Sequence, residues 1–290
     1  MKLYSPATIA AIKDKYGFRF TKSLGQNFLI DQNVIEKILD ESLIEKEDLV
    51  IEIGPGIGVL TAAVAQRAGK VIAVEIDKNL IPILRETLKD YENIEILHQD
   101  ILKTDLGEII RKNEQINGER TRAVSIIGNL PYYITTPILM KILEERVPAS
   151  RITVMLQKEV ADRMKAGPGT KAYGALSVAV QYYAAVTHVA TVPRDVFIPK
   201  PNVDSTVVRL DIRKERLVDL IDENVFFECV KKGFGQRRKT LLNSLTGICG
   251  LDKNEVLLAL NSAGIDAGRR AETLNLNEFA LLANQIKGVN

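Results

Sequence analysis

Residues 49–58 read Leu-Val-Ile-Glu-Ile-Gly-Pro-Gly-Ile-Gly, an apolar run that ends in three closely spaced glycines. The run over 49–53 predicts a buried strand, and the helical spacing of apolar residues over 59–68 predicts a helix after the turn. Glycine is needed where the backbone adopts positive φ or lies in contact with a ligand. A glycine turn can also be only a tight strand-to-helix connection, so its sequence context decides its meaning.

Short apolar runs of strand length recur along the chain, and each follows a segment of helix length. These runs are 71–75, 94–97, 123–127 and 152–156. Strands that alternate with helices at this spacing are typical of βαβ units and a parallel sheet. Two further runs, 184–190 and 205–210, are separated by the proline-rich loop 192–203. Two strands without a helix between them predict an antiparallel hairpin at one edge of the sheet.

Only helical patterns follow in the last part of the chain, over 226–234, 238–246, 253–263 and 277–286. The sequence therefore predicts an α/β fold with two domains. The first, over residues 1–213, is a Rossmann-like sheet with an antiparallel edge hairpin and is expected to be catalytic. The second, over residues 214–290, is a small all-helical domain that we expect to bind RNA or substrate.

The composition is that of an ordinary globular protein, with 46% hydrophobic and 26% charged residues. Its formal net charge of +2 means that any nucleic-acid surface must be a local patch. Two cysteines and two histidines exclude a disulfide framework and leave no plausible zinc site. No apolar run approaches the roughly 20 residues that a membrane span needs. We expect a soluble, monomeric, cytoplasmic protein with no metal and no membrane association.

The glycine turn and the strand ends around it predict the ligand. Glu75 ends the second strand, about 20 residues beyond the turn, where a carboxylate can accept both ribose hydroxyls of an adenosine. The spacing is G-x-G-x-G, whereas a dinucleotide site requires G-x-G-x-x-G to face a pyrophosphate. Glu52 would repel pyrophosphate but suits a ligand with an ammonium and a sulfonium, and Asp100 is placed to accept from an adenine amine. Gly54, Gly56, Glu75 and Asp100 thus predict S-adenosylmethionine, and the glycine spacing disfavours the alternative, a nicotinamide dehydrogenase.

The segment Asn129-Leu130-Pro131-Tyr132 follows the fourth predicted strand. An exocyclic adenine nitrogen is a poor nucleophile until acceptors on both amine hydrogens localise its lone pair. The Asn129 side-chain oxygen and the Leu130 carbonyl offer two acceptors, Pro131 stiffens the loop, and Tyr132 offers a flat face for stacking. The alternative is an ordinary turn with an aromatic side chain folded back.

These motifs carry a family resemblance. The Asn-Leu-Pro-Tyr tetrapeptide is similar to the acceptor motif of amino-methyltransferases that act on adenine or cytosine. The segment 24–29, Leu-Gly-Gln-Asn-Phe-Leu, resembles the N-terminal cofactor motif of the ribosomal RNA adenine dimethyltransferases. The resemblance implies that one set of residues lines the cofactor pocket: Asn27, Leu29, Gly54, Glu75, Asp100 and Asn129. Gln26 and Phe28 belong to the same motif but are open to a second interpretation, in which they only pack the loop.

The segment 192–205, which contains the proline-rich loop, resembles a loop of the bacterial small-subunit branch of that family. In the family an aromatic side chain here faces the target base opposite the tyrosine, which implies this role for Phe197. A hydrophobic plug beneath the loop is the alternative. Arg194 and Lys200 flank Phe197 and are candidates for phosphate contacts.

A second basic cluster, Arg237, Arg238 and Lys239, lies in a stretch that we expect to begin a helix. It is either an RNA-backbone contact or a solvated helix face. The resemblance spans residues 19–274 and implies the partner and the reaction. The partner is the small ribosomal subunit with its 16S rRNA, and the products are two adjacent N6,N6-dimethyladenosines in its 3′ hairpin. A large-subunit rRNA methyltransferase and a non-catalytic ribosome assembly factor are the alternatives.

Overall fold

The computed structural model describes residues 2–21, 24–116, 118–236 and 238–289. The chain forms two compact units, one of residues 1–161 with 187–212 and one of residues 162–186 with 213–290. The division predicted from the sequence places 162–186 with the catalytic part, whereas by compactness this segment belongs to the second unit. A division into functional domains at residue 213 stays a prediction.

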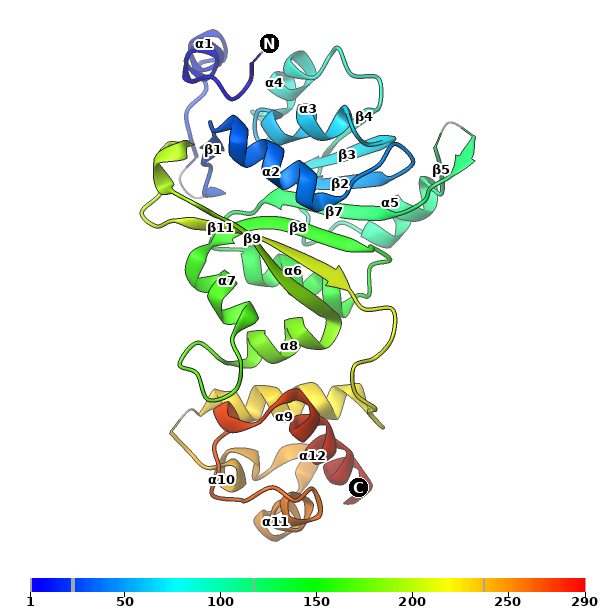
Figure 1. Cartoon of the computed structure of the whole chain (residues 1–290), viewed down its shortest axis with the longest axis vertical. Helices are drawn as coiled ribbons and strands as arrows, with labels where there is room; N and C mark the ends of the chain where they lie inside the picture. Colours follow the sequence, from blue (N-terminus) through cyan, green and yellow to red (C-terminus); the bar gives the residue numbers. More distant parts are fainter. Residues whose placement is uncertain (1, 22–23, 117, 237, 290) are drawn as a thin grey trace. The chain divides into compact units, whose positions relative to one another are not determined.

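The first unit is built on a seven-stranded sheet in the order β4-β3-β2-β7-β8-β11-β9 (Figure 1). The strands β4, β3, β2, β7 and β8 are parallel to one another. β11 lies antiparallel to β8, with Ser205 opposite Gln157. The predicted Rossmann-like sheet with an antiparallel pair at its edge is confirmed. The strand bounds are β2 Leu49–Ile53, β3 Lys70–Glu75, β4 Ile94–His98, β7 Val124–Asn129, β8 Arg151–Gln157, β9 Ala184–Val192 and β11 Ser205–Ile212.

Helices cover the central strands, and every residue of β2 is buried as a result. Parallel strands are covered on both faces in such sheets, which explains the continuous apolar run in the sequence. Figure 1 shows α2 and α3 on one side of the sheet and α5 and α6 on the other. Besides the N-terminal helix described below, the helices of this unit are α2 Gln32–Ser42, α3 Val59–Ala65, α4 Ile81–Thr87, α5 Leu106–Lys112, α6 Thr135–Glu144 and the first half of α7, Lys158–Lys165.

The N-terminal segment carries two elements that the sequence analysis does not predict, the helix α1 (Pro6–Tyr16) and the strand β1 (Phe28–Leu29). β1 pairs antiparallel with β10 (Phe197–Ile198), so that Leu29 lies opposite Phe197. This pair joins the 24–29 segment to the proline-rich loop. A second short pair, β5 (Gln115–Ile116) with β6 (Glu119–Arg120), forms a small hairpin after α5.

The second unit is helical, as predicted for the C-terminal part of the chain, and its core contains the fully buried rings of Phe226 and Phe279. One prediction in it is wrong in detail. Arg238 and Lys239 do not begin a helix but lie in a turn, because α10 starts only at Leu241, after the N-cap Thr240. The helices are α8 Ala175–Tyr183, α9 Glu223–Gly235, α10 Leu241–Leu245, α11 Lys253–Ser262 and α12 Leu276–Val289.

Candidate cofactor and acceptor site

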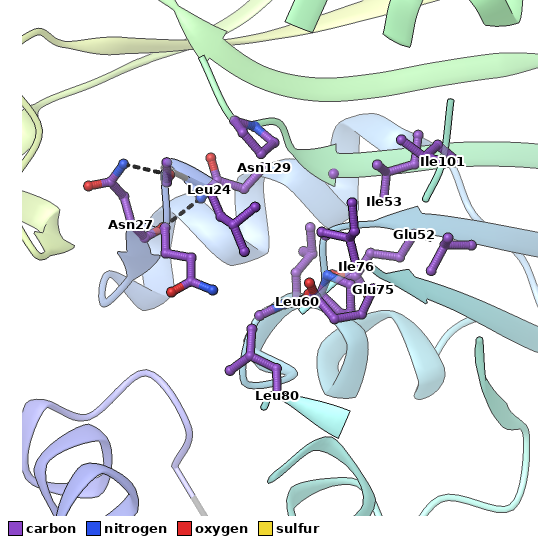
Figure 2. Close-up of a pocket in the computed structure, with 18 of the residues that line it drawn as sticks. Leu24, Asn27, Glu52, Ile53, Leu60, Glu75, Ile76, Leu80, Ile101 and Asn129 are labelled. Carbon is purple, nitrogen blue, oxygen red and sulfur yellow. Dashed lines mark hydrogen bonds between the residues drawn. The ribbon is translucent and has the colours of Figure 1, made fainter. Parts of the chain in front are cut away.

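A pocket opens at the carboxyl ends of β2, β3 and β7 in the first unit (Figure 2). The strand order reverses between β2 and β7, and α/β sheets bind their ligands at such a reversal. The structure brings all the sequence-predicted cofactor residues together here, since each of them lines this one pocket: Asn27, Leu29, Gly54, Gly56, Glu75, Asp100 and Asn129.

The glycine turn, which connects β2 to α3, forms the floor of the pocket. The Gly54 N–H donates to the Val74 carbonyl oxygen at 3.0 Å, which holds the turn against β3. Gly56 has a φ of 62°, and a Cβ placed on it would lie 3.0 Å from the ring of Phe28. Only glycine fits here without strain, because both the backbone angle and the approach of the ring exclude a side chain.

Glu75 is held at the end of β3 by backbone donors. Its carboxylate accepts hydrogen bonds from the Asp77 N–H at 2.8 Å and from the Gly56 N–H at 3.3 Å. Glu75 is only 5% exposed. Its burial outweighs the effect of these hydrogen bonds and raises the pKa of Glu75 to about 7. Hydroxyl donors from a ribose would favour the ionised carboxylate and lower this pKa.

Glu52 is a second carboxyl on the pocket, and it lies with Glu75 on one side of it (Figure 2). It is 1% exposed, and its Oε2 accepts no hydrogen bond within the described part of the chain. Burial, together with the charge of Glu75, raises the pKa of Glu52 to about 8. A buried carboxyl oxygen without a partner fits a pocket for a cationic ligand, because a bound cation would offset the cost of ionising it.

Leu24 and Asn27 line the other side of the pocket, where the Asn129 side chain points toward the backbone of Asn27 (Figure 2). The Asn129 side-chain amide donates to the Asn27 carbonyl at 2.8 Å, and the Asn27 side-chain amide donates to the Gly25 carbonyl at 3.0 Å. Gln26 donates to the Asp77 carboxylate at 2.7 Å. Gln26 therefore both lines the pocket and anchors the segment, and Phe28 does both as well, because its ring packs on Phe18.

The hydrogen bond from Asn129 to Asn27 fixes the orientation of the Asn129 amide group. Because the nitrogen faces a carbonyl oxygen, the side-chain oxygen Oδ1 faces the other way and can accept from a ligand. Leu130 is 1% exposed, and its N–H donates to the Met155 carbonyl at 3.0 Å. Pro131 follows it and lines the pocket. Asn129 and Pro131 are thus brought into the pocket, whereas the Leu130 side chain belongs to the core.

The two predicted stacking residues do not line the pocket. The Tyr132 hydroxyl lies 2.7 Å from Ser205 Oγ, and its ring is half-buried. Phe197 is 3% exposed and packs in the same apolar cluster as Leu29, which matches the plug interpretation of this residue. Contacts of Tyr132 and Phe197 with a target base stay predictions. Tyr133, which lies just outside the Asn-Leu-Pro-Tyr motif and is not predicted from the sequence, does line the pocket.

The described basic candidates lie in two places, the proline-rich loop and the segment before α10. The backbone N–H of Arg194 donates to Asp204, and its guanidinium donates to the Asn202 carbonyl at 3.2 Å. Lys200 forms an ion pair with Asp195 and lowers the pKa of that carboxyl. Both side chains thus help to fold the proline-rich loop. Arg238 and Lys239 belong to the second unit, and Arg237 lies outside the described residues. RNA contacts by all five stay predictions.

Two classes of feature are not found among the residues that the structure describes. No cluster of three or more His, Cys, Asp or Glu side chains has an arrangement suited to a metal ion. No described helix is both long and apolar enough to cross a membrane.

The sheet order, the glycine turn and the strand-end carboxyls define a Rossmann-like methyltransferase that uses S-adenosylmethionine. The chain belongs to the ribosomal RNA adenine dimethylase family, which matches residues 17–287. Ribosomal RNA small subunit methyltransferase A of Clostridioides difficile is 54% identical over 285 residues, with 98% of this chain and 97% of that protein covered. The protein of the same name from Alkaliphilus metalliredigens is 52% identical over 286 residues, with 98% of each covered.

Two solved structures share the fold of most of the chain. A dimethyladenosine transferase from Plasmodium falciparum superposes with a TM-score of 0.74 at 26% identity, covering 88% of this chain and 95% of the other. The 23S rRNA methyltransferase ErmE superposes with a TM-score of 0.67 at 27% identity, covering 90% of this chain and 99% of the other.

Proposed function

We propose that this enzyme dimethylates the N6 amines of two adjacent adenines in the 3′ hairpin loop of 16S rRNA, in four separate transfers. The substrate would be the small ribosomal subunit during its assembly, and the enzyme would act as a monomer in the cytoplasm. The names of the C. difficile and A. metalliredigens relatives support the small subunit as substrate. The name of the P. falciparum structure supports dimethyladenosine as product.

The observation that carries the acceptor assignment is the hydrogen bond from Asn129 to the Asn27 carbonyl. It aims Asn129 Oδ1 away from Asn27, so that this oxygen can accept one hydrogen of the adenine amine. The carbonyl oxygen of Leu130 would accept the other hydrogen. Leu130 is held in place by its buried side chain and by the hydrogen bond from its N–H to the Met155 carbonyl. Two fixed acceptors localise the lone pair of the nitrogen, as a nucleophile requires.

The cofactor-binding roles follow from the same pocket. Glu75 would accept the ribose hydroxyls, Asp100 the adenine amine, and Glu52 would face the cationic groups of the ligand. Gly54 and Gly56 would allow the ligand to approach the backbone, while Asn27 and Leu29 would complete the lining of the pocket. When bound, S-adenosylmethionine supplies a methyl group attached to a sulfonium. The leaving group of the transfer is a neutral thioether.

The chain's own contribution to the reaction is then positioning. The adenine nitrogen forms the new N–C bond as the S–C bond breaks, and the proton that the nitrogen carries afterwards passes to water. No side chain on the pocket has to act as a general base. Tyr132 would hold the ring of the target base by stacking, and Phe197 would contact the opposite face only if the proline-rich loop shifts.

The assay uses labelled S-adenosylmethionine with immature small subunits from a strain that lacks this enzyme. We expect label in the 3′ hairpin as N6,N6-dimethyladenosine. The absence of this product would contradict the proposed function. The similarity to ErmE favours a second candidate, a large-subunit rRNA methyltransferase. Incubation with naked 23S rRNA in the same assay separates the two, because only the second candidate predicts label there.

A further inference from the structure

Tyr133 is the one aromatic side chain that the fold leaves in solvent. It is 59% exposed, whereas every other tyrosine and phenylalanine, all within the described ranges, is buried or half-buried. Burial of an aromatic side chain is among the larger favourable contributions to folding, and this one is forgone here. Tyr133 also lines the cofactor pocket. An exposed aromatic at the edge of a ligand pocket is a candidate for binding a flat ligand.

The backbone around Tyr133 is fixed, although its ring is exposed. The Ile134 N–H and the Thr135 hydroxyl both donate to the Pro131 carbonyl, at 3.1 and 3.0 Å, and these bonds close the turn that carries Tyr133. Gly25 packs against this turn. A Cβ placed on Gly25 would lie 3.6 Å from Tyr133 Cδ1 and 3.3 Å from Pro131 Cβ. The Tyr133 ring is therefore supported at one edge by the 24–27 segment.

Tyr132 and Tyr133 are consecutive in the sequence but have different partners. The Tyr132 hydroxyl bonds to Ser205 at the start of β11, whereas the Tyr133 ring lies beside Gly25, near enough for an added Cβ to touch it. One ring is half-buried beside the acceptor turn, and the other is exposed at the pocket edge. The two rings therefore offer two separate stacking surfaces, and a single target base needs only the one at Tyr132.

We propose that Tyr133 stacks on the unpaired base next to the target adenine, so that the site binds two successive nucleotides. This inference rests on the proposed function, in which the neighbouring base is itself the second adenine to be methylated. Stacking on tyrosine tolerates any base, so the same contact serves whichever adenine lies in the pocket. The contact would hold the RNA strand in place while its two adenines exchange positions.

The test compares three variants of the full chain, Tyr133→Phe, Tyr133→Leu and Tyr133→Ala. Phenylalanine keeps the ring, and leucine keeps apolar bulk without a stacking face. We expect wild-type kinetics for Tyr133→Phe. For Tyr133→Leu and Tyr133→Ala we expect the KM for immature small subunits to rise about tenfold, as the loss of one stacked base predicts. Cofactor affinity, measured by titration with S-adenosylhomocysteine, and the thermal midpoint are expected to match wild type.

Two outcomes would overturn the inference. One is an unchanged KM for subunits in Tyr133→Leu and Tyr133→Ala. The other is a loss of S-adenosylhomocysteine affinity that accounts for the whole defect, because the ring would then serve the cofactor and not the RNA. In both outcomes the wild-type enzyme still methylates the subunits, so the proposed function is not contradicted. A wild-type protein that leaves the subunits unmethylated would contradict the proposed function and the inference together.

Discussion

The Tyr132 hydroxyl lies 2.7 Å from Ser205 Oγ, a bond that joins the acceptor turn after β7 to the first residue of β11. Ser205 is fully buried, so one end of the bond is fixed in the sheet. The next residue back, Asp204, accepts the backbone N–H of Arg194 at 3.0 Å and so closes the proline-rich loop. The two consecutive residues thus anchor both the tyrosine and the loop that carries Phe197.

This relationship predicts that Ser205 orients Tyr132 for stacking. We expect Ser205→Ala and Tyr132→Phe each to lower kcat/KM for subunits about fivefold, because each removes a hydrogen bond worth about 1 kcal/mol. The double variant should be no worse than either single one, since both remove the same bond. Initial rates for the four proteins complete the cycle. Fully additive losses would show that the bond does not couple the two residues.

The acceptor assignment predicts a separation of catalysis from binding. Asn129→Ala removes the oxygen that localises the lone pair and should lower methyl transfer by a factor of about 100 to 1000, as for the loss of other fixed polar groups in active sites. Sedimentation with immature subunits should still show binding, because the basic side chains proposed to contact RNA are unchanged in this variant. Transfer at the parental rate would refute the assignment, and loss of subunit binding would show that Asn129 acts mainly in recognition.

Gly56 allows a test of the pocket floor. Gly56→Ala places a Cβ 3.0 Å from Phe28 Cε1 at a φ of 62°, so we expect cofactor affinity to fall at least tenfold. Gly118→Ala is the matched control, because Gly118 has a φ of 85° and, its chain neighbours aside, no atom of the described residues lies within 4 Å of the added Cβ. It should carry a similar backbone strain of about 1 kcal/mol and bind cofactor normally. Equal effects of the two substitutions would mean that strain alone, and not the approach of Phe28, explains the loss.

The buried carboxyls predict how stability depends on pH. Glu52 has an ordinary pKa of 4.5 that burial raises to about 8 in the folded chain. Between these values the folded state holds more protons than the unfolded state, so the free energy of unfolding falls as pH rises from about 5 to 8. One such group contributes a slope of at most about 1.4 kcal/mol per pH unit.

Denaturant unfolding at several pH values measures this slope. Glu52→Gln should flatten it, because an amide mimics the protonated carboxyl and does not titrate. Glu75, whose pKa is raised to about 7 by burial, would account for the slope that remains. The exposed Glu92 offers a control, and Glu92→Gln should follow wild type. Identical slopes for Glu52→Gln and wild type would show that Glu52 does not titrate in this range.

Much of the fold could be predicted from the sequence because the central strands of its sheet are buried on both faces. The continuous apolar run of 49–53 coincides with β2, and the strand-end residues Glu75 and Asn129 reach one pocket because parallel strands share a carboxyl edge. The two-residue strands β1 and β10 could not be predicted, because two residues show no alternation. Their pairing buries Phe197 beside Leu29, a long-range contact that local sequence does not encode.

The basic cluster shows a different limit. A run of charged residues is typical of an exposed helix face. In the structure, however, α10 begins only at Leu241, and Arg238 and Lys239 precede it in a turn. Tyr133 could not be predicted as a site residue, because the recognisable motif ends at its neighbour Tyr132. The one signal in the sequence is an aromatic residue directly after that motif. Only the structure, in which Tyr133 is 59% exposed, shows that its ring does not belong to the core.

The most direct test of the central claim is a map of the methylated nucleosides in small-subunit RNA after reaction with the purified chain. Immature subunits from a strain that lacks the enzyme are incubated with S-adenosylmethionine, and the 3′ hairpin fragment is analysed by mass spectrometry. We expect N6,N6-dimethyladenosine at two adjacent adenines with wild type and at neither adenine with Asn129→Ala. An unmodified hairpin with wild type, or dimethyladenosine only in large-subunit RNA, would contradict it.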